Sequence, residues 1–214
     1  LRRALTNVGL IPGLGSELPS SYEVTLQEIC RAAGELSSRR IGGLIVLRRE
    51  VGLEEYTEHA IEIDAKVSHQ LLVSIFLPTS PIHDGAVVID HDRIVVAGAV
   101  LPLSFNPSIS SSYGTRHRAA MGLAERTDAL LVVVSEETGV ISLIREGRIT
   151  KELDEKSLFS ALYRLTIYRY QRREKIKKQQ KLGEAKPEAV ASKDSGDSEN
   201  GVEGLENDGA KEAV

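Results

Sequence analysis

The sequence lacks several features that would at once assign the protein to a broad class. It has one cysteine, Cys30, so an internal disulfide is excluded and a reducing compartment is expected. No apolar run approaches the ~18 residues that a membrane-spanning helix needs. The net charge of -4 over 214 residues is mildly acidic, so a general affinity for nucleic acid is not implied. Any anion site must therefore be a local cluster of basic residues.

The length suits one domain with a sizeable core and appendages. We predict an N-terminal helix and linker over residues 1–21, a folded domain over 22–170, and a basic helix end with an acidic tail over 171–214. The tail has no aromatic residues and is rich in Gly, Ser, Glu and Asp. Such a composition cannot bury enough apolar surface to offset the entropy of ordering, so we expect disorder from about residue 182.

Apolar periodicity within the folded domain indicates interleaved helices and strands. The expected helices span 23–39, 53–60, 68–77, 116–126 and 154–170, and the expected strands span 42–47, 61–63, 86–90, 93–97, 129–134 and 140–144. Short polar turns join two pairs of strands as hairpins. We therefore predict an α/β fold, a mixed β-sheet flanked by helices. Cys30 falls in the periodic run of the first helix, which favours packing over a role as nucleophile.

The stretch GTRHRAA, residues 114–120, places two arginines and a histidine at the start of a predicted helix. We assign Thr115 as the N-cap, with the helix starting at about Arg116. The helix dipole disfavours cations there unless an anion is present, and the free N–H groups can bind phosphate. The pattern fits a phosphate site, but it also fits a solvated basic helix start that pairs with nearby carboxylates.

Carboxylates occur at two further points. HDGA, residues 83–86, leads into a predicted strand, where an aspartate can bind a divalent metal or accept a hydroxyl proton. A turn that feeds a hairpin is the more ordinary interpretation of the same residues. SEETG, residues 135–139, offers two carboxylates between two strands, although Glu-rich β-turns are common. A metal phosphohydrolase is disfavoured because HDGA and the second His-Asp pair, residues 91–92, both adjoin strands, and only 5 histidines are present.

Taken together, HDGA, LPLS (residues 101–104), GTRHRAA and SEETG resemble in this order the diadenylate cyclase family, the bacterial synthases of cyclic di-AMP. The resemblance covers about residues 1–155 and is strongest to the membrane-anchored type. In that type the segment beginning LRRAL follows three transmembrane helices, which would explain why this chain begins with leucine. The family has a mixed β-sheet flanked by helices and joins two ATP molecules into cyclic di-AMP with release of two pyrophosphates.

The resemblance also implies roles for individual residues. Asp84 would bind a divalent metal ion, such as Mn, Mg or Co, and would help to deprotonate the 3′-hydroxyl. Glu137 would bind the same metal, and His83 would also reach it. The substrate-binding residues would be Leu44 and Leu101 at adenine, Gly85 and Ala86 where the nucleotide approaches the backbone, and Thr115, Arg116, His117, Arg118, Ser135 and Glu136 at the phosphates. Arg116, His117 and Arg118 would share the catalytic role with Asp84.

Partners and location follow from the same resemblance. Each subunit would bind one ATP, and two subunits would meet face to face as a homodimer, so that each 3′-hydroxyl attacks the α-phosphate of the other ATP. An N-terminal anchor that this chain does not contain would hold the full protein at the cytoplasmic face of the bacterial membrane, while the fragment itself would be soluble. A membrane-bound regulator and a phosphoglucosamine mutase would be further partners.

A nucleotide-binding module that senses ATP or cyclic di-AMP without turnover is the alternative function. Asp84 and Glu137 argue against it, because a pure binder does not need metal-binding carboxylates.

Overall fold

The computed structural model describes residues 20–107 and 113–168. The expected N-terminal helix and the basic end with its acidic tail lie outside these residues. The helices are α1 (Ser20–Ser38), α2 (Glu54–Thr57), α3 (His69–Phe76), α4 (Thr115–Ala124), α5 (Glu155–Tyr163) and the π-helical η1 (Arg164–Tyr168). The strands are β1 (Gly43–Leu47), β2 (Ile61–Lys66), β3 (Ala86–Asp90), β4 (Arg93–Ala99), β5 (Leu130–Val134), β6 (Ile141–Arg145) and β7 (Arg148–Leu153).

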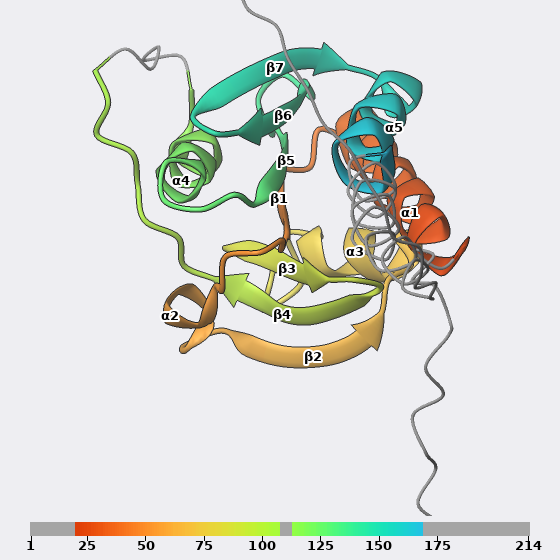
Figure 1. Ribbon diagram of the computed structural model, residues 1–214, viewed down its shortest axis with the longest axis horizontal. Coiled ribbons are helices and arrows are strands. Elements are labelled where there is room, and N and C mark those ends of the chain that lie inside the picture. Colours follow the sequence, from red (N-terminus) through yellow and green to blue (C-terminus); the bar gives the residue numbers. More distant parts are fainter. Residues whose placement is uncertain (1–19, 108–112, 169–214) are drawn as a thin grey trace, which may run out of the picture. The chain divides into compact units, whose positions relative to one another are not determined.

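The strands form one mixed sheet in the order β2-β4-β3-β1-β5-β6-β7. Strands β1 and β3 are parallel, and every other neighbouring pair is antiparallel. Helices α1, α3 and α5 lie on one side of the sheet and α4 lies on the other (Figure 1). The predicted α/β class with a mixed sheet is confirmed.

Each face of the sheet has its own hydrophobic core. In β1, Ile45 and Leu47 pack with α1, α3 and α5, while Leu44 and Val46 pack with α4. All five residues of β1 are buried, as expected for a strand that is covered on both faces. Cys30 lies in the first core, where burial raises its thiol pKa to about 12. Its predicted role in packing is confirmed.

The structure corrects several local expectations. Strand β7 was not predicted, because its sequence RITKEL contains only two apolar residues and most of it is exposed at the sheet edge. Helix α2 is four residues long, shorter than the predicted helix over 53–60. The N-cap of α4 is Gly114, with φ -70° and ψ 179°, and Thr115 is the first helical residue. The assignment of Thr115 as N-cap was therefore wrong.

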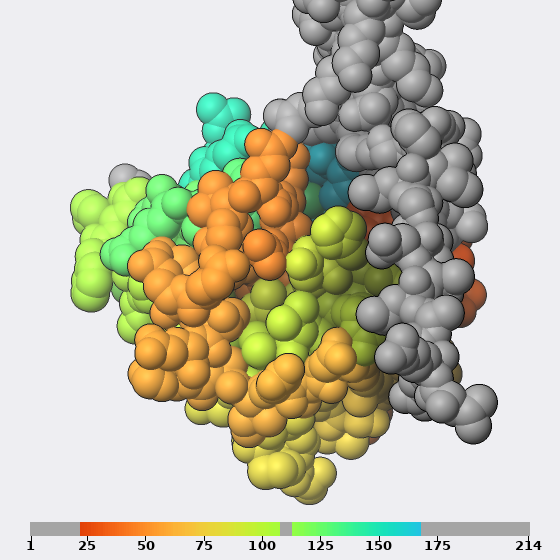
Figure 2. All heavy atoms as spheres, turned by 60° about the horizontal axis from the view of Figure 1, so that its bottom comes forward, coloured from red at the N-terminus to blue at the C-terminus, as the bar shows by residue number. Residues whose placement is uncertain are grey.

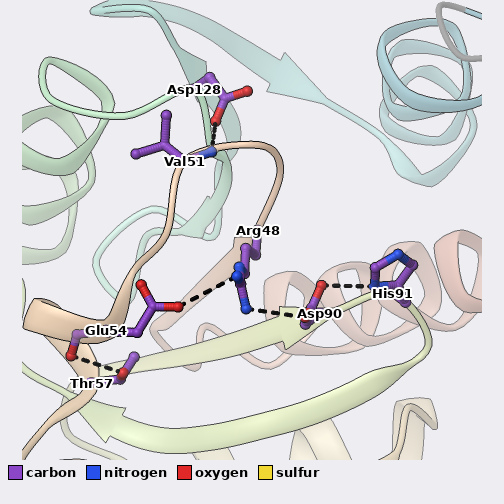
Figure 3. A network of polar contacts seen from close by, with 7 residues as sticks. All are labelled: Arg48, Val51, Glu54, Thr57, Asp90, His91 and Asp128. Carbon is purple, nitrogen blue, oxygen red and sulfur yellow. Dashed lines mark hydrogen bonds and ion pairs between the residues drawn. The ribbon is translucent and has the colours of Figure 1, made fainter.

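Polar contacts hold the segment between β1 and α2 at the end of the sheet where β1 and β3 finish. The Arg48 guanidinium lies 3.2 Å from the Asp90 carboxylate and 3.4 Å from that of Glu54, and Asp128 accepts a hydrogen bond of 3.0 Å from the Val51 amide (Figure 3). Figure 2 shows this orange segment on the surface. These contacts fix one end of the sheet, and the basic and acidic motifs described above gather at the other.

Candidate functional site

Two cavities meet at the start of α4, at the end of the sheet where β1 and β3 begin and β5 ends. The first, called here the apolar cavity, has a volume of about 210 Å³ and is lined by Leu44, Asp84, Gly85, Ala99, Val100, Leu101, Leu103, Thr115, Arg116 and Ala119. The second, the polar cavity, has a volume of about 230 Å³ and is lined by Tyr113, Gly114, Thr115, Arg116, His117, Val134, Ser135, Glu136, Glu137, Thr138, Val140, Ser142, Lys151 and Glu152. Thr115 and Arg116 line both cavities.

The apolar cavity is built from strand ends. Leu44 comes from β1, and Asp84 and Gly85 come directly before β3. Gly85 has φ +111°, and a Cβ there would lie 2.7 Å from the backbone carbonyl carbon of Gly98. Glycine is therefore required at this position for the approach of β4, in addition to any role in admitting a ligand.

Arg116, like Thr115, lines both cavities. Its Nη1 donates a hydrogen bond of 2.8 Å to Glu136 Oε2, while its Nε is buried and has no hydrogen-bond partner among the residues that the structure describes. A Cβ on Gly42 would lie 2.5 Å from Arg116 Nη1, so the guanidinium fits only because position 42 has no side chain. A buried donor without a partner is costly, and it indicates a place for an acceptor such as a phosphate oxygen.

His117 is buried in the wall of the polar cavity. Its ring centroid lies 4.9 Å from that of Tyr113, and its Nε2 lies 3.3 Å from Ser142 Oγ. Burial, and secondly the charge of Lys151, hold its pKa below the ordinary value of 6.5. The imidazole is therefore neutral at pH 7, so it offers a bound anion a hydrogen bond rather than a full charge.

The acidic turn between β5 and β6 forms the facing wall of the polar cavity. Glu136 and Glu137 both line it. Within the turn, Ser135 Oγ accepts a hydrogen bond of 3.3 Å from the Thr138 amide. The structure therefore brings the GTRHRAA and SEETG motifs together, as a phosphate site would require.

Three residues of the expected site line neither cavity. Arg118 is half-buried and Ala86 is buried in the core with α4. His83 is half-buried next to Asp84, and its Nδ1 lies 2.6 Å from the carbonyl oxygen of Ser80.

Other residues of the site were missed by reasoning from sequence. They are Gly42, Tyr113, Ser142, Lys151 and Glu152. Lys151 and Glu152 belong to β7, the strand that the apolar pattern did not reveal. Gly42 carried a signal, because two adjacent glycines open the first strand. The reason for a glycine at this position is the Arg116 guanidinium, which lies where a side chain would be.

The donor set fits a metal ion that arrives together with a nucleotide. Among the residues that the structure describes, no group of three or more His, Cys, Asp and Glu side chains could hold a metal by itself. The polar cavity nevertheless has three carboxylates, Glu136, Glu137 and Glu152, against the cations Arg116 and Lys151. The carboxylates outnumber the cations, so without a divalent cation the cavity would repel a triphosphate. Mg²⁺ is commonly held by one or two carboxylates together with substrate phosphates.

Comparisons with known proteins show to which family the chain is related. Residues 30–149 match the DAC family model, described as DisA bacterial checkpoint controller nucleotide-binding. The chain is 42% identical over 161 residues to the cyclic di-AMP synthase CdaA of Bacillus subtilis (strain 168), which covers 74% of this chain and 59% of the relative. It is 42% identical over 165 residues to a diadenylate cyclase of Listeria monocytogenes serotype 1/2a (strain 10403S), which covers 76% of this chain and 60% of the relative. The chain thus spans about 60% of the length of these curated relatives.

Solved structures give the same result for the fold. The crystal structure of a double mutant of DacA from Staphylococcus aureus matches with a TM-score of 0.66 at 41% identity, covering 68% of this chain and 97% of that chain. A Bacillus cereus structure described as a hypothetical membrane spanning protein matches with a TM-score of 0.58 at 39% identity, covering 64% and 67%. In the part of this chain that the structure describes, no helix is both long and apolar enough to cross a membrane.

Proposed function

This chain belongs to the DAC family, and on that premise we propose that it is a diadenylate cyclase, which joins two ATP molecules into cyclic di-AMP and releases two pyrophosphates. The observation that carries the proposal is the pair of cavities that meet at Thr115 and Arg116. ATP has the same division, an apolar base at one end and a charged triphosphate at the other. The two cavities suit one ATP lying across Arg116.

The proposed placement follows the chemistry of the walls. Adenine lies against Leu44 and Leu101 in the apolar cavity, where Asp84 is the one carboxylate. The phosphates pass Arg116 into the polar cavity, where Ser135 lines the wall. Arg116 Nε, which has no hydrogen-bond partner among the described residues, gains an acceptor in a phosphate oxygen. This placement puts Asp84 on the ribose side of the triphosphate.

The proposed reaction is two successive phosphoryl-type transfers. The 3′-oxygen of one ATP attacks the α-phosphorus of the other, Asp84 accepts the 3′-hydroxyl proton, and the bond from the α-phosphorus to pyrophosphate breaks. The second 3′-oxygen attacks in the same way and closes the ring. Arg116 stabilises charge at the phosphates, and neutral His117 provides a hydrogen bond. A divalent cation bound by Asp84 and Glu137, with His83 as a further candidate ligand, would supply additional charge neutralisation.

The described residues contain one such pair of cavities, whereas the reaction needs two ATP molecules in opposite orientation. We therefore propose a homodimer in which a two-fold axis brings two sites face to face. Membrane attachment through a preceding segment, a membrane-bound regulator and a phosphoglucosamine mutase stay predictions from the family resemblance.

Incubation of the protein with ATP and Mn²⁺, followed by mass spectrometry, tests the proposed activity. We expect cyclic di-AMP and pyrophosphate in a ratio of one to two. ATP binding without any cyclic di-AMP would contradict the proposal and would favour the nucleotide-sensing module instead.

A further inference from the structure

The edge strand β7 is irregular beside the polar cavity. Ile141 pairs with Leu153, but Leu143 pairs with Thr150, so Lys151 and Glu152 together face the single residue between them on β6. Glu152 has φ +56°, in the left-handed region that a glutamate rarely adopts. This arrangement is a β-bulge, a feature that redirects side chains and is common beside active sites.

The bulge places the ammonium group of Lys151 at the polar cavity. Its Nζ lies 4.4 Å from the centroid of the Tyr113 ring, and both side chains line the cavity. A cation over an aromatic face is held in place without being neutralised. The ion pairs found among the described residues do not include Lys151, whereas Arg116 is paired with Glu136. Lys151 is therefore available to pair with an incoming anion.

The order of residues along the two cavities indicates which part of the nucleotide Lys151 would meet. Asp84 lines only the apolar cavity, Arg116 lines both, and Lys151 lines only the polar one. A nucleotide that crosses from one cavity to the other therefore meets Lys151 beyond Arg116. That position corresponds to the terminal phosphates rather than to the ribose or the base.

We propose that Lys151 binds the terminal phosphates of the nucleotide and makes the site prefer a triphosphate to a monophosphate. The proposal deepens the proposed function and rests on it in assigning phosphate to the polar cavity. Tyr113 acts as a positioning residue, because its ring holds the ammonium beside the start of α4. The simplest alternative is a solvated lysine that contacts no ligand.

Binding measurements with nucleotides that cannot react test this role apart from turnover. The probes are 3′-deoxy-ATP, which lacks the attacking hydroxyl, and 3′-deoxy-AMP, titrated calorimetrically with Mn²⁺ present. The variants are Lys151→Met, the conservative Lys151→Arg, and the matched control Lys66→Met on β2, the opposite edge strand of the sheet. Thermal unfolding of each variant checks that the fold is kept.

We expect Lys151→Met to weaken 3′-deoxy-ATP binding by about tenfold or more, as for loss of a charge-assisted hydrogen bond, and to change 3′-deoxy-AMP binding less than about twofold. Lys151→Arg should restore most of the affinity, and Lys66→Met should match the parent. Equal weakening of both probes, or no change in either, overturns the proposal. If the parent binds 3′-deoxy-ATP but makes no cyclic di-AMP, the proposed activity fails while the role of Lys151 stands. If the parent does not bind it, both fail.

The imidazole of His117 reports independently on the position of the Lys151 ammonium. The charge of Lys151 contributes to the lowered pKa of His117, so Lys151→Met should raise that pKa while Lys66→Met leaves it unchanged. An NMR titration of the histidine resonances measures this shift. An unchanged His117 pKa in Lys151→Met would show that the ammonium does not occupy the cavity wall.

Discussion

The apolar and polar cavities differ in what fixes their walls. Strand residues such as Leu44 and Ala99, together with Ala119 on α4, form much of the apolar wall, and Leu44 and Ala99 also belong to the core around α4. The polar cavity is formed by a helix start, a tight turn and a bulged edge strand, and five of its lining residues are Arg116, Glu136, Glu137, Lys151 and Glu152. Packing thus shapes the apolar cavity, whereas backbone irregularity and charge shape the polar cavity. Substitutions in the two cavities should therefore differ in their effects on activity and on folding.

The largest effect is expected for Asp84→Asn. The change removes the negative charge and the proton acceptor from the apolar cavity while keeping the shape of the side chain, so the fold should be kept. Loss of several kcal/mol of transition-state stabilisation corresponds to a decrease in kcat of roughly a thousandfold or more. Cyclic di-AMP formation measures it, with Asp92→Asn in the β3–β4 turn as the matched control. A variant that works at close to the parent rate would show that Asp84 is not the reactive carboxylate.

Alanine substitutions of the two arginines in the basic motif should lower activity by different amounts. Arg116 lines both cavities and Arg118 lines neither. Loss of a charge-assisted contact worth about 1.5–3 kcal/mol predicts a decrease in kcat/KM of roughly tenfold to a hundredfold for Arg116→Ala. The effect of Arg118→Ala should be smaller. Steady-state kinetics separate the two, and equal losses would mean that Arg118 also reaches the substrate.

Gly42→Ala should displace Arg116 without removing it. The added Cβ would lie 2.5 Å from Arg116 Nη1, so the guanidinium has to move. We expect kcat/KM to fall by about tenfold, because small misplacements of a charged group are costly in catalysis. Gly34→Ala on α1 is the control, since its Cβ makes only an ordinary contact of 3.4 Å with Glu155. Kinetics equal in the parent and in Gly42→Ala would mean that Arg116 can move without consequence.

The smallest effect on activity is expected for a substitution of Glu28 on α1, which packs on the face of the sheet opposite to α4. Hydrogen bonds from the His69 amide, at 2.8 Å, and from the His69 ring hold the Glu28 pKa below its ordinary value of 4.5. The stabilisation is therefore present above about pH 4.5 and is lost as the pH falls through the lowered pKa. Glu28→Gln should lower the free energy of unfolding by about 1 kcal/mol at pH 7 and by less at pH 3.

Urea unfolding at the two pH values measures this difference, with Glu35→Gln on α1, a half-buried carboxylate that pairs with Arg39, as the control. Catalysis should not change, since Glu28 lines neither cavity. A loss of stability that is the same at both pH values would contradict the ionic origin of the effect.

The strands of the core could be predicted from the sequence because their apolar runs are continuous. Strand β1 is buried on both faces, and β3 matches its predicted range of 86–90. The edge strand β7 could not be predicted from the sequence, because an exposed strand such as RITKEL needs few apolar residues. The same cause hid Lys151, whose direction depends on a bulge that no periodic pattern reveals.

The motifs of the site were recognisable as short sequences, but their grouping was not. Asp84 and Arg116 lie 32 positions apart in the chain, and only the parallel pairing of β1 with β3 and the packing of α4 bring them to one cavity. The sequence placed Arg116, His117 and Arg118 together at a phosphate site, whereas burial lowers the pKa of His117 and Arg118 lines neither cavity. Burial is a property of the folded chain, so a motif cannot report it.

In the proposed function each chain provides one nucleotide site, and the reaction needs two. Specific activity measured over a wide range of protein concentration, with sedimentation velocity on the same samples, tests this most directly. We expect specific activity to rise with protein concentration wherever the protein is mainly monomeric and to level off as dimers form. Specific activity that stays constant in samples shown to be monomeric would contradict it.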